Sequence, residues 1–162
     1  MNATLTNPAN LWQRVIDSHH QYSQAFSEFL TTADDKVQVL RKALRSKDRV
    51  LALQAIPSLS TGEKVELFPE WIDLARSAHS PFQAAWSVIE SLPRAWILEN
   101  IEKEVDPILR NDDETDYWMF LQLYALLDND LMRKLAHRAA GHADAGIKEL
   151  GQECLAKVKS VA

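Results

Sequence analysis

The chain has 162 residues, a formal charge of −5 and 46% hydrophobic residues. This size predicts one domain spanning residues 1–162, and the negative charge disfavours general binding to nucleic acid. Cys154 is the only cysteine, which excludes an intramolecular disulfide and a cysteine-rich zinc site. The chain has no run of 18 apolar residues, and its N-terminus lacks the basic start and apolar stretch of a signal peptide. We therefore expect a cytoplasmic protein with no membrane span.

Apolar residues recur at helical spacing along the chain, and no stretch alternates with a period of two. We therefore predict an all-α protein of about nine helices. The first should span residues 8–31, because Asn7 can cap it and Pro8 suits the first helical position. Ser60 and Glu63 form a capping box, and Ser80 is expected to cap a later helix. Four helix pairs are expected over residues 34–158: Asp34–Leu59, Thr61–Leu92, Pro93–Leu127 and Asp128–Val158.

These helix pairs recur at a spacing of thirty-odd residues. Leu59 and Leu92 are 33 residues apart, and Leu92 and Leu127 are 35 apart. Helix pairs that recur at such a period indicate an α-solenoid. The stretch from Asp48 to Ile56 resembles the second helix of HEAT-type repeats, and Pro69 and Pro107 lie near the ends of first helices, where that family often bends. The resemblance implies antiparallel helix pairs stacked as a short right-handed solenoid. An irregular helical bundle is the alternative.

Negative charge is concentrated in one part of the sequence. Residues 1–98 have no net charge, whereas residues 99–116 carry eight acidic and two basic side chains. Glu104 and Asp106 lie near a helix C-terminus, where the helix dipole disfavours them, so folding alone does not explain the excess. We predict an exposed acidic surface that attracts a basic partner. The predicted partner-binding residues are Glu104, Asp106, Asp112, Asp113, Glu114, Asp116, Trp86 and Tyr117.

Catalytic and metal-binding patterns are not found in the sequence. His137 and His142 are five residues apart, whereas metal-binding pairs on a helix are spaced by three or four. There is no Gly-x-Ser-x-Gly motif and no glycine-rich phosphate loop. We therefore expect a non-enzymatic protein with no catalytic residue, no metal site and no cofactor.

The leading hypothesis is a protein-binding module that presents a solenoid surface to a basic protein. By analogy of size and charge, it is similar to bacterial immunity proteins, which neutralise basic toxin domains. A HEAT-like adaptor or scaffold subunit is the alternative. A less favoured one is a nucleic-acid-binding helical repeat that uses the basic residues Lys36, Arg41, Lys42, Arg45, Lys47 and Arg49.

Overall fold

The computed structural model describes residues 7–77 and 81–159, with side chains up to residue 157. Within these ranges the chain is all-helical and has no strand. The elements are α1 (Pro8–Thr32), α2 (Lys36–Leu44), α3 (Arg49–Leu53), the 3-10 turn η1 (Ile56–Ser58), α4 (Thr61–Glu66), α5 (Phe68–Ala75), α6 (Phe82–Glu90), α7 (Arg94–Leu109), α8 (Glu114–Leu127), α9 (Asn129–Ala140) and α10 (Ala145–Lys159).

The predicted local signals at two helix starts are confirmed. The Asn7 side chain accepts a hydrogen bond from the backbone N–H of Ala9 and caps α1. Ser60 and Glu63 form both bonds of a capping box at α4. The predicted cap at Ser80 lies outside the described residues, and α6 follows Pro81.

The described residues form ten α-helices, one more than the sequence predicted. The predicted helix after Ser60 is divided at Leu67 into α4 and α5. Pro69 lies in the first turn of α5 and has no backbone N–H, so it cannot donate to the carbonyl of Val65 and continue α4. Pro107, in contrast, remains inside α7 near its end.

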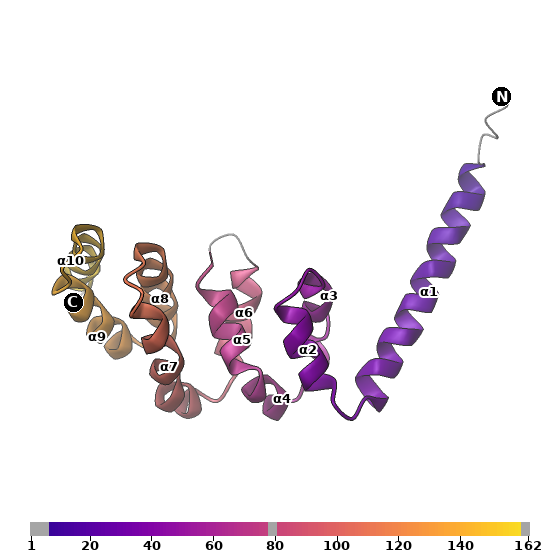
Figure 1. Ribbon diagram of the computed structural model, residues 1–162, viewed down its shortest axis with the longest axis horizontal. Coiled ribbons are helices and arrows are strands. Elements are labelled where there is room, and N and C mark those ends of the chain that lie inside the picture. Colours follow the sequence, from indigo (N-terminus) through magenta and orange to yellow (C-terminus); the bar gives the residue numbers. More distant parts are fainter. Residues whose placement is uncertain (1–6, 78–80, 160–162) are drawn as a thin grey trace.

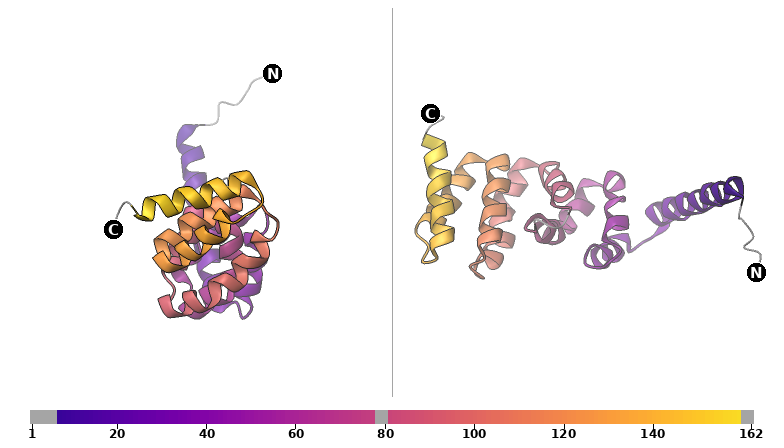
Figure 2. Two further views of the ribbon diagram at one scale, coloured as in Figure 1. Left: turned by 90° about the vertical axis from the view of Figure 1, so that its left-hand side faces the viewer. Right: turned by 90° about the horizontal axis from the view of Figure 1, so that it is seen from above.

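The helices follow one another in chain order along the long axis of the molecule, from α1 at one end to α10 at the other (Figure 1). Helix α5 packs on α6, α7 and α8, and α8 in turn packs on α7, α9 and α10. The view from above shows the same order, with α1 at one end extending away from the other helices (Figure 2, right).

The core runs between these helices. Leu59, Leu92 and Leu127, which define the repeat spacing, are all buried, and they follow η1, follow α6 and end α8 respectively. The largest fully buried side chains include Trp71, Tyr117 and Phe120. None of the 25 residues of the long helix α1 is buried.

A buried carboxylate connects α2 to α5. The Glu70 side chain is only 1% exposed, and its Oε1 lies 2.6 Å from Arg45 and 3.3 Å from Arg41. Its other oxygen, Oε2, has no hydrogen-bond partner in the described part of the chain. Burying a carboxylate is costly unless cations compensate it, so these two arginines are required by the packing of α5.

This arrangement predicts a specific stability pattern. Arg41→Met together with Arg45→Met should lower the free energy of unfolding by about 3–5 kcal/mol, because Glu70 is then a buried charge without a cation. Adding Glu70→Met should restore most of this loss, since the buried charge is removed as well. Urea denaturation of the three proteins measures both effects. A triple variant as unstable as the double variant would contradict the role assigned to Glu70.

Helices α9 and α10 approach closely at Gly151. A Cβ atom there would lie 2.3 Å from the backbone N of Ala140 and 2.6 Å from the carbonyl O of Ala136. We expect Gly151→Ala to destabilise the protein by about 1–3 kcal/mol, because the backbone of α9 has to move. Gly62→Ala is the matched control, because the nearest atom to its added Cβ is the Ser60 Oγ at 4.0 Å. That control should be neutral or stabilising by up to about 1 kcal/mol, which chemical denaturation would show.

Candidate functional site

Along the chain, the predicted acidic residues become exposed in the loop between α7 and α8. Asp113 caps α8, because its side chain accepts a hydrogen bond of 3.1 Å from the backbone N–H of Asp116. Asp112 has a φ of 54°, which is the left-handed conformation that non-glycine residues seldom adopt. Residues held in such conformations cluster at binding and catalytic sites, which makes this loop a candidate site.

Asp112 also contacts the next helix pair through His142. The two side chains lie 3.0 Å apart, between the carboxylate and Nε2 of the imidazole. Nδ1 of His142 accepts a hydrogen bond from the backbone N–H of Asp144. With Nδ1 acting as the acceptor, the ring proton lies on Nε2, which donates it to the Asp112 carboxylate. The contact leaves the Asp112 side chain 60% exposed, so its carboxylate is still available to a partner.

Two of the predicted binding residues are buried, and the expectation that Asp116 is exposed is wrong. Asp116 is 7% exposed and pairs with Arg76 at 3.2 Å. Tyr117 is 1% exposed and lies between the ring of His142 and the guanidinium of Arg138. Both side chains point into the packing between helices, because they lie on the inner face of the first turns of α8.

The acidic excess is in large part explained by folding, which corrects the sequence argument. Besides Asp112 and Asp116, two carboxylates of α7 pair with α9: Glu102 with Lys134 at 2.8 Å, and Asp106 with Arg138 at 2.7 Å. Cations 32 residues further along the chain therefore compensate the negative end of α7. Of the predicted residues, Asp113 and Glu114 are exposed and have no ion pair within the described part of the chain, and Glu104 is half-buried.

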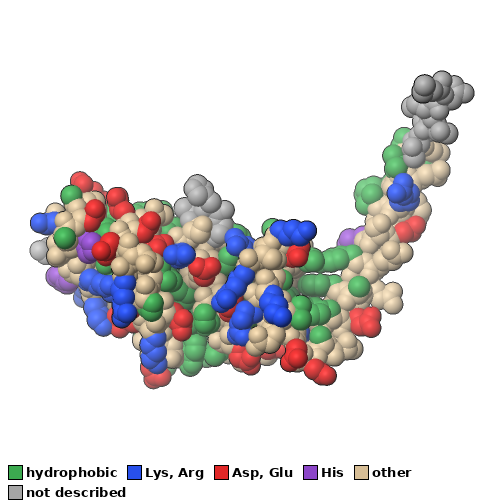
Figure 3. Space-filling view, viewed as in Figure 1, with side chains coloured by type: hydrophobic (Ala, Val, Ile, Leu, Met, Phe, Trp, Pro, Cys, Tyr) green, Lys and Arg blue, Asp and Glu red, His purple; other side chains and the backbone are tan. Residues whose placement is uncertain are grey.

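The basic segment has a similar explanation. Lys36 pairs with Glu63 at 2.8 Å, and Arg49 donates to the carbonyl O of Leu44. Together with the two arginines on Glu70, four of its six cations are used within the fold. The space-filling view shows Lys and Arg side chains gathered over α2 and α3 and again toward the α7–α10 end (Figure 3). On the face shown, these groups are mixed with carboxylates and do not form a continuous basic surface.

Trp86 has partners within the chain. Its indole N–H donates to the carbonyl O of Ala75 at 3.2 Å, and its ring lies edge-on to Phe82 with centroids 5.2 Å apart. The side chain is half-buried between α5 and α6. The surroundings of Trp86 are therefore those of a side chain packed between helices rather than of an exposed binding residue.

An exposed aromatic side chain close to the exposed carboxylates in the chain is Trp118, which was not among the predicted binding residues. It is 45% exposed and lines a shallow hollow of about 470 Å³ with Glu114, Thr115 and Leu150. The Glu114 carboxylate lies against Gly146, where a Cβ would be 2.3 Å from its Oε2. The signal that could have identified this face is Gln122, the polar residue one turn after Trp118 on a mostly apolar helix.

The arrangement is suited to recognition. A half-exposed tryptophan at a hollow is a common anchor for a protein partner, and the surrounding carboxylates favour a basic one. Among the described residues, no group of three or more His, Cys, Asp and Glu side chains could hold a metal ion. None of the helices described combines the length and apolar character needed to cross a bilayer.

Comparisons of this chain with protein-family models, with curated proteins and with solved structures find no match. A function therefore has to be argued from the geometry above.

The burial of Asp116 has a measurable pH signature. Burial raises the pKa of this carboxyl above its ordinary 3.8, and the Arg76 charge offsets part of the rise. Between the two pKa values the folded chain binds more protons than the unfolded chain, so stability falls as the pH rises through this window. Asp116→Asn is neutral at every pH. Its stability relative to the native chain should increase as the pH rises from about 3 to about 7.

Urea denaturation at a series of pH values measures this difference. Asp73→Asn is the control for the loss of a contact to the same arginine, because Asp73 is exposed and lies 3.1 Å from Arg76. A gap between the Asp116 variant and the native chain that stays constant with pH would show that burial does not disfavour the charged form.

Proposed function

We propose that the chain is a non-enzymatic protein-binding module whose helix pairs form a short, right-handed HEAT-like solenoid. Three observations support it: the helices lie in chain order, helices α4 to α10 pack on neighbouring helices, and Leu59, Leu92 and Leu127 are buried at corresponding places. In such an array each pair covers only adjacent pairs, so extended surfaces remain open for a partner.

The observation that carries the proposal is the half-exposed Trp118, which shares its hollow with Glu114. Asp112 and Asp113 directly precede Glu114 in the chain, and we call these four residues the Trp118 surface. The indole supplies an apolar anchor, and desolvated tryptophans contribute a large share of the binding energy at interfaces. The three carboxylates supply long-range attraction to a basic partner and raise its association rate. Charge and an apolar anchor in one place fit a basic protein better than a small anionic ligand.

Neutralisation of a basic toxin domain is the specific form of this proposal. Its support is the carboxylate-rich Trp118 surface together with the small size of the chain. A scaffold role would use the same helical array and requires no particular charge on its partner. The salt dependence of binding therefore distinguishes the two, because exposed charges are screened over about 8 Å at physiological ionic strength.

The test neutralises the surface without changing its shape. Asp112→Asn, Asp113→Asn and Glu114→Gln together remove three charges, and asparagine both tolerates the left-handed conformation and caps a helix. We expect unchanged helicity and about a tenfold or greater loss in the rate at which the partner is captured at low salt. Trp118→Ala should instead increase the dissociation rate.

Glu66→Gln, Glu90→Gln and Glu149→Gln form the matched control, since they remove three exposed charges from other helices. A candidate partner is a protein that both the native chain and the control capture from cell extract. Neither of the two surface variants captures it. A captured enzyme that loses activity as the chain is added supports neutralisation. A partner that binds all variants at the same rate at low salt excludes the Trp118 surface.

A further inference from the structure

Helix α1 carries a row of large side chains at alternating spacings of three and four residues, which we call the α1 seam. Its members are Trp12, Val15, His19, Tyr22, Phe26 and Phe29. This spacing is the heptad pattern of a helix that packs lengthwise against another helix. Yet no residue of α1 is buried within this chain. The seam is therefore only partly used by the fold.

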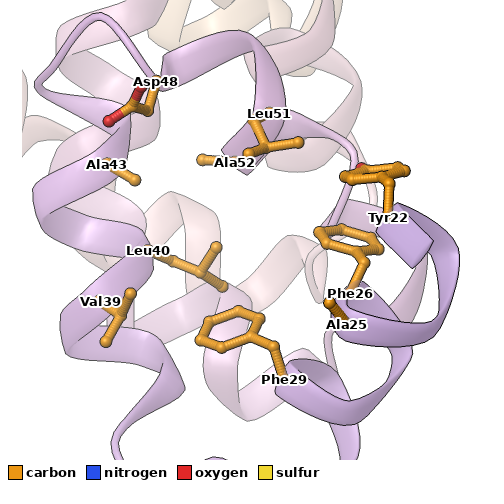
Figure 4. Close-up of a pocket in the computed structure, with 10 residues that line it drawn as sticks. All are labelled: Tyr22, Ala25, Phe26, Phe29, Val39, Leu40, Ala43, Asp48, Leu51 and Ala52. Atoms are coloured by element: carbon orange, nitrogen blue, oxygen red, sulfur yellow. The ribbon is translucent and has the colours of Figure 1, made fainter. Parts of the chain in front are cut away.

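The C-terminal half of the seam forms one wall of an apolar groove. Tyr22, Phe26 and Phe29 face Val39, Leu40 and Ala43 of α2, and the α3 side chains of Leu51 and Ala52 close one end (Figure 4). The groove has a volume of about 310 Å³. Tyr22 and Phe26 stack on each other with centroids 5.5 Å apart, and the Tyr22 hydroxyl donates to Gln54. Asp48 is the one charged side chain that lines the groove.

The N-terminal half of the seam has no such cover. Leu11, Trp12 and Val15 are 44%, 65% and 54% exposed, and this half of α1 stands clear of the other helices (Figure 1). Trp12 cannot reach the groove of its own chain, because the continuous helix holds it about 25 Å from Phe29. The chain thus has an apolar anchor at the N-terminal end of α1 and an apolar groove beside its C-terminal half. The anchor cannot contact the groove of its own chain.

We propose that a second copy of this chain joins the two features, with the α1 helices packed antiparallel about a two-fold axis. Placing the axis between His20 and Gln21 sets Trp12 opposite Phe29 of the second copy and Val15 opposite its Phe26. His19 then lies opposite Tyr22 of the second copy. The exposed N-terminal half of each α1 covers the groove wall of the other chain. The same contact therefore forms twice in one closed, isologous interface.

The charges of α1 are compatible with this pairing. Its charged residues are Arg14, Asp17 and Glu28, and all three occupy outer positions of the heptad, away from the seam. The positions that flank the seam are occupied by small or apolar residues, including Ile16, Ser18, Ser23 and Ala25. Two copies therefore bring no like charges together along the contact, despite a net charge of −5 on each chain.

The exposed Trp12 side chains contribute a substantial part of the apolar area of a dimer interface. A tryptophan that is 65% exposed offers roughly 160 Å², so the two Trp12 side chains alone remove roughly 300 Å² from water. That is about a fifth of a standard interface of about 1,600 Å². The remaining exposed side chains of the seam and the groove extend the contact along both helices.

Sedimentation equilibrium of the full chain over a range of concentrations tests the proposal. The native protein should have the mass of two chains. Trp12→Glu and Val15→Glu should each weaken the dimer at least about thirtyfold, because a charge enters the desolvated seam. Gln21→Glu and Gln24→Glu are matched controls that add the same charge to outer positions of the same helix. Glutamate is a good helix former, so α1 should remain helical in all four variants.

Disulfide formation in a Cys154→Ser background tests the orientation. A mixture of Val15→Cys chains and Phe26→Cys chains should form a mixed disulfide dimer, because these residues are opposite in the antiparallel arrangement. Neither variant should cross-link by itself. Cross-linking of Val15→Cys chains alone would indicate a parallel pair and would overturn the proposal.

A native chain that is monomeric at every concentration, or seam variants that dimerise like the controls, would also overturn it. A monomeric native chain that binds vesicles of anionic phospholipid through Trp12 would assign the seam to a membrane surface. One that captures another protein through Trp12 would assign it to that partner. The α1 seam and the Trp118 surface lie toward opposite ends of the molecule (Figure 1). Loss of binding at one therefore leaves the test of the other intact.

Discussion

The buried carboxylate of Glu70 shows the constraint on which the linear arrangement of this chain depends. The main contacts between helix pairs join pairs that follow each other in the chain, so these contacts have to hold the molecule together. At the first of these contacts Glu70 is removed from water and depends on Arg41 and Arg45 of the preceding pair. The α7–α9 contact uses the same chemistry with the signs exchanged, since α7 supplies the carboxylates and α9 the cations. At both contacts ion pairs join specific facing helices, while the apolar core supplies the buried surface area.

The same constraint explains where recognition surfaces remain. A pair in the middle of the array is covered on both sides, whereas α1 lies at the end and has a neighbour on one side only (Figure 1). Large apolar side chains are therefore left exposed along α1, among them Trp12 and Val15. Trp118 is exposed for a related reason, because it lies on the outer edge of α8. Exposed aromatic side chains at such places are candidates for binding, since the fold gains nothing by keeping them in water.

The candidate site could be predicted only in part. Asp113 and Glu114 were identified correctly as exposed, because the start of a helix is a local feature of the sequence. The neighbouring aromatic residue was misjudged: Tyr117 is buried and Trp118 is exposed. Adjacent helical residues point about 100° apart, so an error of one position exchanges the inner and outer faces. Helix α8 has eight buried residues and apolar side chains on nearly every face, which leaves Gln122 as the main marker of the outer one.

The sequence by itself determined the elements of this protein, and the tertiary structure decided the partners of its charges. Helical periodicity, the cap at Asn7 and the capping box of Ser60 and Glu63 involve residues within one or two turns, so they can be read directly from the chain. The break at Pro69 also has a local cause, since proline lacks the donor that would continue α4. The partners of the concentrated charges could not be predicted from residues nearby in the sequence. Their ion pairs join residues 25 to 40 positions apart, and this distance is bridged only when one helix pair packs against the next.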